Sequence, residues 1–364
     1  SIETMHAAKT DKLNLFTLSE RISGTLLPDV KIVDMREELR ARNFSIFSDL
    51  LEQKIRTTLD AKEQTILFLN RRGSASSTLC RDCGFVMKCN HCELPLTYHA
   101  RKFKTQSLLC HHCGLIEKMP TFCPNCKGER IKQLGVGTER VEAELQKLFP
   151  LARIARADRD TMNRKDSFEN LHEKLQNGTI DILIGTQMIG KGFDIPNVSL
   201  VGVILADLGL HIPDFRTPER IFELLTQVAG RAGRRKKQGE VIIQTYNPQH
   251  PSILHSQTHN YLGFYEQEIS SRKEALLPPF GKLVKLMFVH ESNTVCEEKA
   301  NTLQKILTAK DHASFAAPAF LPRVQGKYQW NVLVQGPDPR VLLKKLSSQE
   351  LAGWRIDVDP ILSI

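Results

Sequence analysis

The chain has 364 residues, of which 41% are hydrophobic, and it carries a formal net charge of +9 at pH 7. This length allows two or three domains, and no apolar run reaches the roughly 18 residues needed to cross a membrane. We therefore expect several domains and no membrane partner. The positive charge favours a polyanionic partner such as nucleic acid, with a solvated basic surface as the alternative.

The first eight residues, SIETMHAA, lack the pattern of a capped helix start. They are typical of a helix that is entered part-way, so we expect the chain to be a fragment of a longer protein. Residues 1–28 are accordingly predicted to be the tail of a preceding domain, or a linker from it.

From residue 29 to about residue 245, short apolar runs alternate with amphipathic segments. Continuous apolar runs are typical of parallel strands that are covered on both faces. The alternation predicts a three-layer α/β domain in two pieces, 29–78 and 129–250. The expected strands are 30–35, 65–70, 152–157, 180–185, 200–207 and 240–246, and the expected helices are 46–60, 138–148, 166–176 and 217–229.

A cysteine-rich insertion, residues 79–128, interrupts this domain before a further strand near 131–135. It holds four Cys-x-x-Cys pairs, and eight thiolates fit two closed, structural four-cysteine zinc sites. A disulfide framework or a redox pair is the alternative, although disulfide-dense domains are usually small and secreted. The spacing alone does not show how the pairs share the two zinc ions. The sharing could be nested, with the outer pairs at one ion and the inner pairs at the other, or sequential, with consecutive pairs at each ion. The pairs are Cys80 and Cys83, Cys89 and Cys92, Cys110 and Cys113, and Cys123 and Cys126.

After a connector at 251–276, residues 277–364 form a second unit with its own periodicity. Expected strands at 282–290, 319–323, 328–335 and 355–359 and expected helices at 294–309 and 337–352 predict a small α+β domain. Lys327 and Trp330 combine a cation with an aromatic surface, which suits stacking on nucleic-acid bases. Packing in the domain core is an equal alternative for Trp330.

The helix at 217–229 ends in the sequence QVAGRAGR, which contains Gln227, Arg231 and Arg234. Two arginines three positions apart project from one side of a helical turn. Guanidinium groups bind phosphate oxygens in pairs, so the segment suits a phosphate partner, with a solvated basic turn as the alternative. The pattern resembles motif VI of superfamily 2 helicases, in which such arginines reach the γ-phosphate of ATP.

The segment GTQMIGKGFDIP follows the strand at 180–185. It is not a P-loop, because Gly192 stands where that motif needs a hydroxyl for Mg²⁺. It resembles helicase motif V, which implies that Thr186 touches the DNA backbone while Gly192 and Asp194 approach the nucleotide. Taken alone, the segment could also be a glycine-rich turn. Arg71 and Arg72 follow the end of the strand at 65–70, in a pattern that resembles helicase motif IV. The carboxyl ends of strands are the places where α/β sheets bind their ligands.

These motifs occur together in the order found in one family. ILFLNRRG, the four cysteine pairs, GTE, DRD, LIGTQMIGKG, QVAGRAGR, LPPF and DVDP resemble the primosomal protein N′ family of replication-restart DNA helicases. The resemblance covers essentially the whole chain. It implies a RecA-like second helicase lobe, an inserted two-zinc module and a C-terminal domain.

The resemblance also implies an activity and a set of site residues. The parent protein would be an ATP-dependent 3′→5′ helicase with Gln227, Arg231 and Arg234 in its catalytic set. The zinc sites would be nested: Cys80, Cys83, Cys123 and Cys126 in one, and Cys89, Cys92, Cys110 and Cys113 in the other. The Mg²⁺ site for ATP would lie in a first lobe that this chain lacks, so we expect the chain alone to be inactive.

The family further implies partners and a location. Forked and single-stranded DNA, single-strand DNA-binding protein, other primosome proteins and the loader of the replicative helicase are expected in the bacterial cytoplasm, at the nucleoid. The alternative from another class is a non-catalytic, zinc-dependent nucleic-acid-binding protein with a vestigial RecA-like fold.

Overall fold

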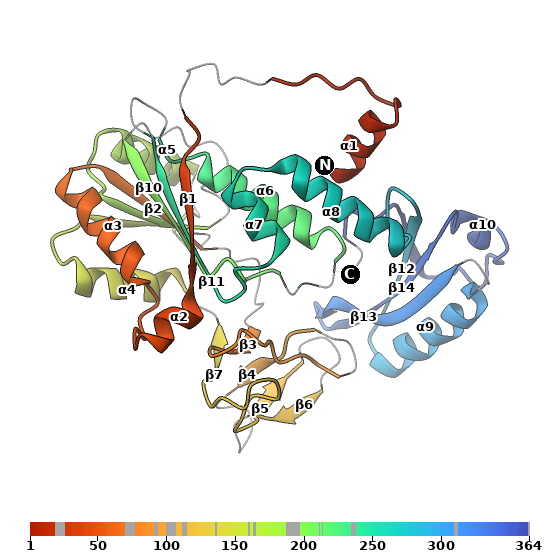
Figure 1. Cartoon of the computed structure of the whole chain (residues 1–364). Coiled ribbons are helices and arrows are strands. Elements are labelled where there is room, and N and C mark those ends of the chain that lie inside the picture. Colours follow the sequence, from red (N-terminus) through yellow and green to blue (C-terminus); the bar gives the residue numbers. More distant parts are fainter. Residues whose placement is uncertain are drawn as a thin grey trace.

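The computed structural model is built around one six-stranded sheet (Figure 1). It describes residues 1–18, 26–69, 77–90, 94–99, 107–110, 115–134, 137–158, 161–162, 165–186, 197–210, 212, 214–233, 238–308 and 312–362. No helix within these ranges is long and apolar enough to cross a membrane.

All six strands of the central sheet are parallel, as the continuous apolar runs predict. Strands β2 and β9 are buried along their whole length, which explains why their sequences do not alternate between apolar and polar residues. The expected α/β fold class is confirmed. The strand order is β1 (Asp29–Asp34), β11 (Glu240–Thr245), β10 (Val198–Ile204), β2 (Gln64–Leu69), β9 (Ile182–Gly185) and β8 (Ile154–Ala157).

Helices cover both faces of this sheet and make the domain three layers deep (Figure 1). One face packs against α5 (Lys165–Gln176), α6 (Thr217–Ala229) and α7 (Pro251–Gln257). The other face packs against α2 (Met35–Arg40), α3 (Asp49–Asp60) and α4 (Thr138–Leu148). We call this unit the α/β domain.

The cysteine-rich insertion forms a small unit of antiparallel strands below the α/β domain in Figure 1. Strand β3 (Ser77–Cys80) enters it and pairs with β7 (Ile131–Leu134), which leaves it. Between them, β4 (Thr97–His99), β5 (Ser107–Leu109) and β6 (Ile116–Lys118) form a three-stranded sheet. We call residues 77–134 the cysteine module. The strand expected near 131–135 therefore belongs to this module's stem and not to the central sheet.

The C-terminal domain is a four-stranded antiparallel sheet with one long helix, α9 (Asn293–Leu307), on one face. Its strand order is β13 (Ala313–Val324), β14 (Lys327–Gly336), β12 (Lys282–His290) and β15 (Trp354–Val358). The connector expected at 251–276 contains α7 and α8 (Tyr261–Glu274).

The helix expected at 337–352 is wrong in extent, because the structure has only α10 (Arg340–Leu343) there. The chain after it turns at Ser347, whose backbone N–H and hydroxyl both donate to the Glu350 carboxylate at 2.7 Å. Serine side chains compete with helical hydrogen bonding in this way, so the apolar spacing of this segment does not produce a longer helix.

The start of the chain is also better formed than its sequence indicates. Helix α1 (Ile2–Lys9) packs against α8, and the Ser1 side chain accepts a hydrogen bond from the Thr4 backbone N–H at 3.2 Å. Ser1 is therefore a helix N-cap, and the expectation of an uncapped start was wrong.

The middle of β10 has no room for a side chain at Gly202. A Cβ atom there would lie 2.7 Å from Leu67 and 2.8 Å from Leu51 of α3. Gly202→Ala should therefore destabilise the α/β domain by about 1–3 kcal/mol, as overpacking usually does. Denaturant unfolding measures this change. Gly137→Ala is the matched control, because a Cβ there meets only Glu139 at 3.7 Å; equal losses in the two variants would contradict the packing argument.

Candidate functional site

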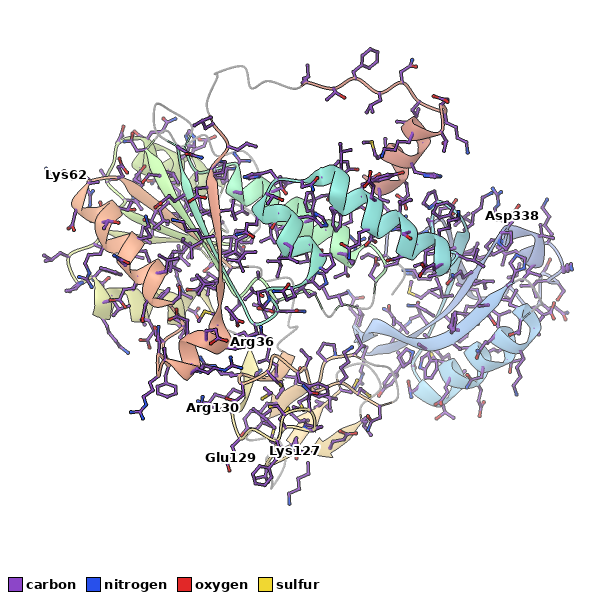
Figure 2. All side chains as sticks on the ribbon, viewed as in Figure 1. Arg36, Lys62, Lys127, Glu129, Arg130 and Asp338 are labelled. Carbon is purple, nitrogen blue, oxygen red and sulfur yellow. The ribbon has the colours of Figure 1, made fainter. Side chains whose placement is uncertain are left out.

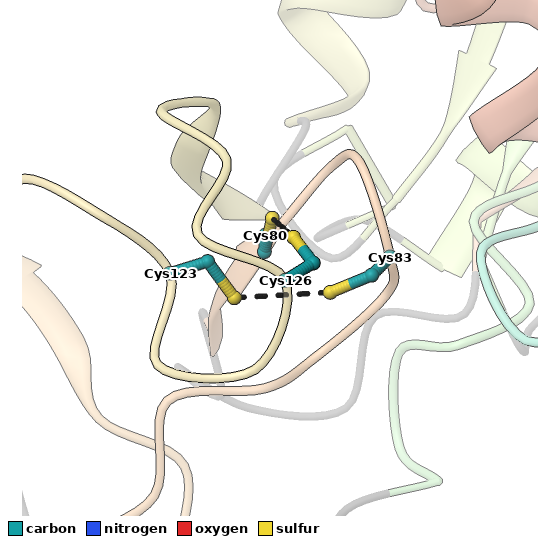
Figure 3. A group of neighbouring side chains, drawn as sticks. All are labelled: Cys80, Cys83, Cys123 and Cys126. Atoms are coloured by element: carbon teal, nitrogen blue, oxygen red, sulfur yellow. Dashed lines mark hydrogen bonds between the residues drawn. The ribbon is translucent and has the colours of Figure 1, made fainter.

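Four cysteine side chains converge at the base of the cysteine module (Figure 3). The sulfur atoms of Cys80, Cys83, Cys123 and Cys126 all lie within 4.8 Å of one another. Cys80 Sγ is 3.6 Å from Cys126 Sγ, and Cys83 Sγ is 3.7 Å from Cys123 Sγ. A tetrahedral zinc ion with Zn–S bonds of about 2.3 Å separates its sulfur ligands by about 3.8 Å. The group can therefore hold a metal ion.

These distances also bear on the disulfide alternative for this group. They are well beyond the about 2.05 Å of a disulfide bond, so the four cysteines are free thiols. The first and fourth pairs in sequence share the centre, which corresponds to the outer half of the nested arrangement. In the inner half, Cys89 and Cys110 are buried, whereas Cys92 and Cys113 lie outside the described residues.

All four cysteine pairs begin with the same backbone hydrogen bond. In each, the N–H of the first cysteine donates to the carbonyl oxygen five residues later, at 2.8 Å: Cys80 to Phe85, Cys89 to Leu94, Cys110 to Leu115 and Cys123 to Gly128. In the two outer pairs, whose residues are all described, this bond closes a tight turn around both cysteines. The two inner pairs thus begin with the local geometry of the two that form the outer centre.

The outer centre is attached to the α/β domain through Tyr246, the residue that follows β11. The Arg81 Nε donates to the Tyr246 hydroxyl at 2.8 Å. Gly84 has φ of 79°, and a Cβ added there would lie 2.7 Å from the Tyr246 carbonyl oxygen. Glycine is needed both for the left-handed backbone and for this close approach. Leu79 and Val86 complete the attachment by packing into the core of the α/β domain.

Polar groups surround the outer thiols. The Asn125 side-chain amide donates to Cys83 Sγ at 3.6 Å, and Asp82 pairs with Arg130 at 3.3 Å. Figure 2 shows Arg36 and Arg130 at the junction between the module and the α/β domain. Burial raises the pKa of the Cys80 thiol well above its ordinary value. Metal binding at this thiol would therefore release a proton.

A buried carboxylate lies beneath the same attachment. Asp207 follows β10 and is 2% exposed. Its oxygens accept hydrogen bonds from the Tyr246 N–H and the Thr245 hydroxyl, both at 2.9 Å. Burial raises the pKa of Asp207 to about 6. The carboxyl ends of β10 and β11 are thus joined by one buried acid, which is hydrogen-bonded to the residue that holds the cysteine module, Tyr246.

The candidate DNA-contacting residue Thr186 lies at the same edge of the sheet. It follows the carboxyl end of β9 and is half-buried, and its N–H donates to the Ala157 carbonyl at the end of β8 at 3.4 Å. Arg71 and Arg72 lie outside the described residues.

The candidate nucleotide-contacting residues lie at the end of α6. Gln227 is exposed on its last turn, and Arg231 is half-buried in the turn that follows. Gly233 has φ of 70°, and its N–H donates to the Val198 carbonyl at the start of β10 at 3.0 Å. This bond ties the turn to the amino edge of the sheet. Gly192, Asp194 and Arg234 lie outside the described residues.

The two sets of candidates therefore lie at opposite edges of the sheet. Thr186 follows the carboxyl end of one parallel strand, and the Arg231 turn is bonded to the amino end of its neighbour but one.

In the C-terminal domain, the structure separates the two candidate residues. Lys327 is exposed at the β13–β14 turn, but Trp330 is 8% exposed and belongs to the domain core. Its Nε1 donates to the Asn293 side chain at 3.0 Å. Core packing is therefore the interpretation that the structure supports for Trp330, and a stacking role would require the domain core to open.

Sequence reasoning missed a buried cluster of charges around Arg272, which is 1% exposed. Its guanidinium pairs with Glu219 of α6 at 2.8 Å and with Glu268 of α8 at 2.9 Å. The available signal was a charged residue, Glu219, among the apolar positions of an otherwise amphipathic helix.

Comparison with known proteins places the chain in a family. Residues 114–236 match the family described as Helicase conserved C-terminal domain, and residues 273–361 match Primosomal protein N C-terminal domain. The Replication restart protein PriA of Bacillus subtilis (strain 168) is 44% identical over 353 residues, which are 95% of this chain and 44% of the relative. This chain belongs to the PriA family. The PriA of Treponema pallidum (strain Nichols) is 39% identical over 99% of this chain and 55% of the relative.

The chain thus spans about half the length of the PriA relatives it matches. Its α/β domain is the RecA-like C-terminal lobe of a helicase. The solved structure of S. cerevisiae Dbp5 bound to RNA and ADP BeF3 is 12% identical and has a TM-score of 0.36, covering 72% of this chain and 46% of that one.

Replacing one outer thiol tests the metal centre of this PriA-family chain. Cys123→Ser should lower the metal content by one ion per chain, because three sulfur ligands leave a closed structural site incomplete. Elemental analysis of the folded, purified protein measures this. Cys296→Ser is the control, because Cys296 is buried in the core of the C-terminal domain. Unchanged metal content in Cys123→Ser would contradict the assignment.

The raised pKa of Asp207 makes the stability of the lobe depend on pH. An acid whose pKa is higher in the folded state, about 6 against an ordinary 3.8, holds its proton more tightly when folded. The cost of burying the charged Asp207 carboxylate therefore lowers the folding stability only where the group loses its proton. This cost is absent at low pH and grows as the pH rises from about 4 to 6. At pH values above about 6, the loss of folding stability reaches on the order of 3 kcal/mol.

The Asp207→Asn variant cannot lose a proton at this position. We expect wild-type stability to fall relative to Asp207→Asn between pH 4 and pH 7, as measured by denaturant unfolding. Parallel stability curves for the two proteins would refute the burial argument.

Proposed function

We propose that this chain is the second helicase lobe, the zinc module and the C-terminal domain of an ATP-dependent 3′→5′ DNA helicase that acts in replication restart at stalled forks. The division would be 1–28 as the linker from a first lobe, 29–78 and 129–250 as the second lobe, 79–128 as the zinc module, 251–276 as a connector, and 277–364 as the C-terminal domain. Membership of the PriA family supports this proposal.

The observation that carries the proposal is the position of Thr186 and the Arg231 turn at opposite edges of one sheet. A motor must bind nucleotide and DNA at separate places and connect them. In the sequence, Gly192 and Asp194 stand between Thr186 and Val198, the residues at the two edges. A change at the nucleotide edge can thereby be passed to the DNA edge over a few residues of chain.

At the nucleotide edge, Arg231 and Arg234 would place their guanidinium groups around the γ-phosphate of ATP, and Gln227 would lie beside them. Arginine in this role is worth about 10³–10⁵ in rate. ATP would bring the reacting phosphate, and Mg²⁺ would be held by a first lobe. The chain alone is therefore proposed not to hydrolyse ATP at a useful rate.

At the DNA edge, Thr186, Arg71 and Arg72 would hold the backbone of the tracked strand, and Lys327 would add a contact from the C-terminal domain. The cysteine module lies at the same edge, because it is inserted after β2 and attached to Tyr246 after β11. A rigid body there is well placed to part a duplex as the strand moves.

Two zinc ions are proposed as the resident metals. The outer sulfur set fits zinc by donor type and spacing. The inner set of Cys89, Cys92, Cys110 and Cys113 is supported by the backbone hydrogen bond that all four pairs share. With all positions filled by thiolates, both ions would stabilise the fold and take no part in hydrolysis.

Forked and single-stranded DNA are the proposed substrates. Single-strand DNA-binding protein, other primosome proteins and the loader of the replicative helicase are the proposed protein partners, in the bacterial cytoplasm at the nucleoid. These partners are carried over from the resemblance to the PriA family and rest on it alone.

A chimera tests the proposal. The part of the Bacillus subtilis relative that lies outside the match would be joined to Ser1, and DNA-stimulated ATP hydrolysis would be measured. We expect activity in the chimera and little in the chain alone, with Arg231→Ala lowering kcat by about 10³-fold or more. Arg340→Ala, which removes an exposed C-terminal pair with Asp338, should leave kcat unchanged. Nucleotide-independent DNA binding with no effect of Arg231→Ala would favour a non-catalytic binding protein.

A further inference from the structure

The amino-terminal end of α6 is held in a cluster of buried charges that joins four parts of the chain. Arg272 of α8 donates to Glu219 of α6 at 2.8 Å and to Glu268 at 2.9 Å, and its Nη1 lies 3.9 Å from Glu3 of α1. Glu219 also accepts from the Ile2 backbone N–H at 2.9 Å. Helices α1, α6 and α8 therefore meet at this one guanidinium.

Arg216, at the N-cap of α6, extends the cluster to the C-terminal end of the described chain. Its guanidinium donates to Glu3 at 2.7 Å and to the Pro360 carbonyl oxygen at 2.7 Å. Both arginines contact the ring of Phe215: its centroid lies 4.4 Å from the Arg216 guanidinium and 5.0 Å from that of Arg272. The segment that follows β15 is thereby bonded to the start of α6.

Such a cluster is poorly explained by stability alone. Burying charges costs solvation, and well-packed apolar residues often serve as well or better. What charges add is direction, because each carboxylate accepts the guanidinium in a limited set of geometries. Arg272 uses separate nitrogens for Glu219 and Glu268, so α6 cannot slide or rotate against α8 without breaking one of these bonds.

The opposite end of the same helix carries the residues toward the nucleotide edge. Helix α6 has 13 residues, which makes it about 20 Å long at 1.5 Å per residue. It behaves as a rod whose position is set by the charge cluster at one end. At the other end, Gln227 and the Arg231 turn follow that position.

We infer that Arg272 and Glu219 are positioning residues that fix α6, and with it the Arg231 turn, relative to α8, α1 and the C-terminal domain. The inference rests on the proposed function only for what Arg231 does; the mechanical link stands on the contacts themselves. By this inference, the C-terminal domain is connected through α6 to the nucleotide edge.

Hydrogen exchange tests the link without any activity. The amides of Arg231, Ala232 and Gly233 are bonded to the carbonyls of Val228, Ala229 and Val198 at 3.0, 3.1 and 3.0 Å. In Arg272→Met, which keeps an unbranched side chain but removes the guanidinium group, these three amides should exchange about tenfold faster or more. Arg153→Met is the control, because it removes an exposed pair with Asp181 in the same lobe, and it should leave the three amides unchanged.

General loss of stability must be separated from loss of position. Gly202→Ala destabilises the same lobe but lies outside the charge cluster. It therefore serves as the reference variant, to be compared with Arg272→Met under conditions in which the two have similar unfolding free energies. Faster exchange at 231–233 in Arg272→Met than in that reference supports the inference. Equal exchange in the two, or a change confined to residues 214–220 and 264–272, overturns it.

Activity in the chimera separates this inference from the proposed function. Arg272→Met should lower kcat about tenfold while leaving KM for DNA unchanged, and Arg272→Lys should recover only part of the loss, because lysine keeps the charge but not the fork. If Arg231→Ala has no effect on hydrolysis, the proposed function fails and the exchange result still decides the link. If Arg231→Ala abolishes hydrolysis but Arg272→Met changes neither exchange nor kcat, the positioning inference fails.

Discussion

The parallel direction of all six strands in the central sheet determines where every other part of the molecule can act. Their carboxyl ends share one edge, so Thr186, Asp207 and Tyr246 come together although they are far apart in sequence. The cysteine module must attach at this edge, because it leaves from β2 and is held by the residue after β11. The amino edge is left to the turn after α6. One topological constraint thus separates two surfaces within a single lobe.

Two different chemical devices join smaller units to this sheet. At the carboxyl edge, four thiols come within bonding range of one metal ion, and the turn that carries two of them is fixed by Arg81, Gly84 and Tyr246. Beside α6, the buried Arg272 with three carboxylates joins α1, α6 and α8, and Arg216 extends this cluster to the C-terminal segment. The cysteine cluster and the charge cluster both depend on directional interactions, whereas apolar packing has no preferred direction. The parts of the chain that they hold have only small hydrophobic cores of their own.

The sequence predicted the parts of this structure that depend on one kind of residue repeated at a fixed spacing. Continuous apolar runs located all six strands of the sheet, and the cysteine pairs located the four thiols that the structure brings together. Contacts between residues of different types that do not recur at a fixed spacing could not be predicted from the sequence. Nothing in the local sequence shows that Ser347 captures Glu350 and ends a helix early, that the Trp330 ring turns into a core, or that Ser1 caps a helix.

The buried charges show why such residues are informative once the fold is known. A glutamate at position 219 breaks the apolar pattern of α6, and periodicity alone treats it as noise. Burial converts it into a requirement for a partner, since an unpaired carboxylate in that position would be far too costly. Arg272 meets the requirement from a helix 53 residues away. The same helix is thus fixed by ions at one end and by a backbone bond from Gly233 to the sheet at the other, which leaves the Arg231 turn little freedom that is independent of the rest of the protein.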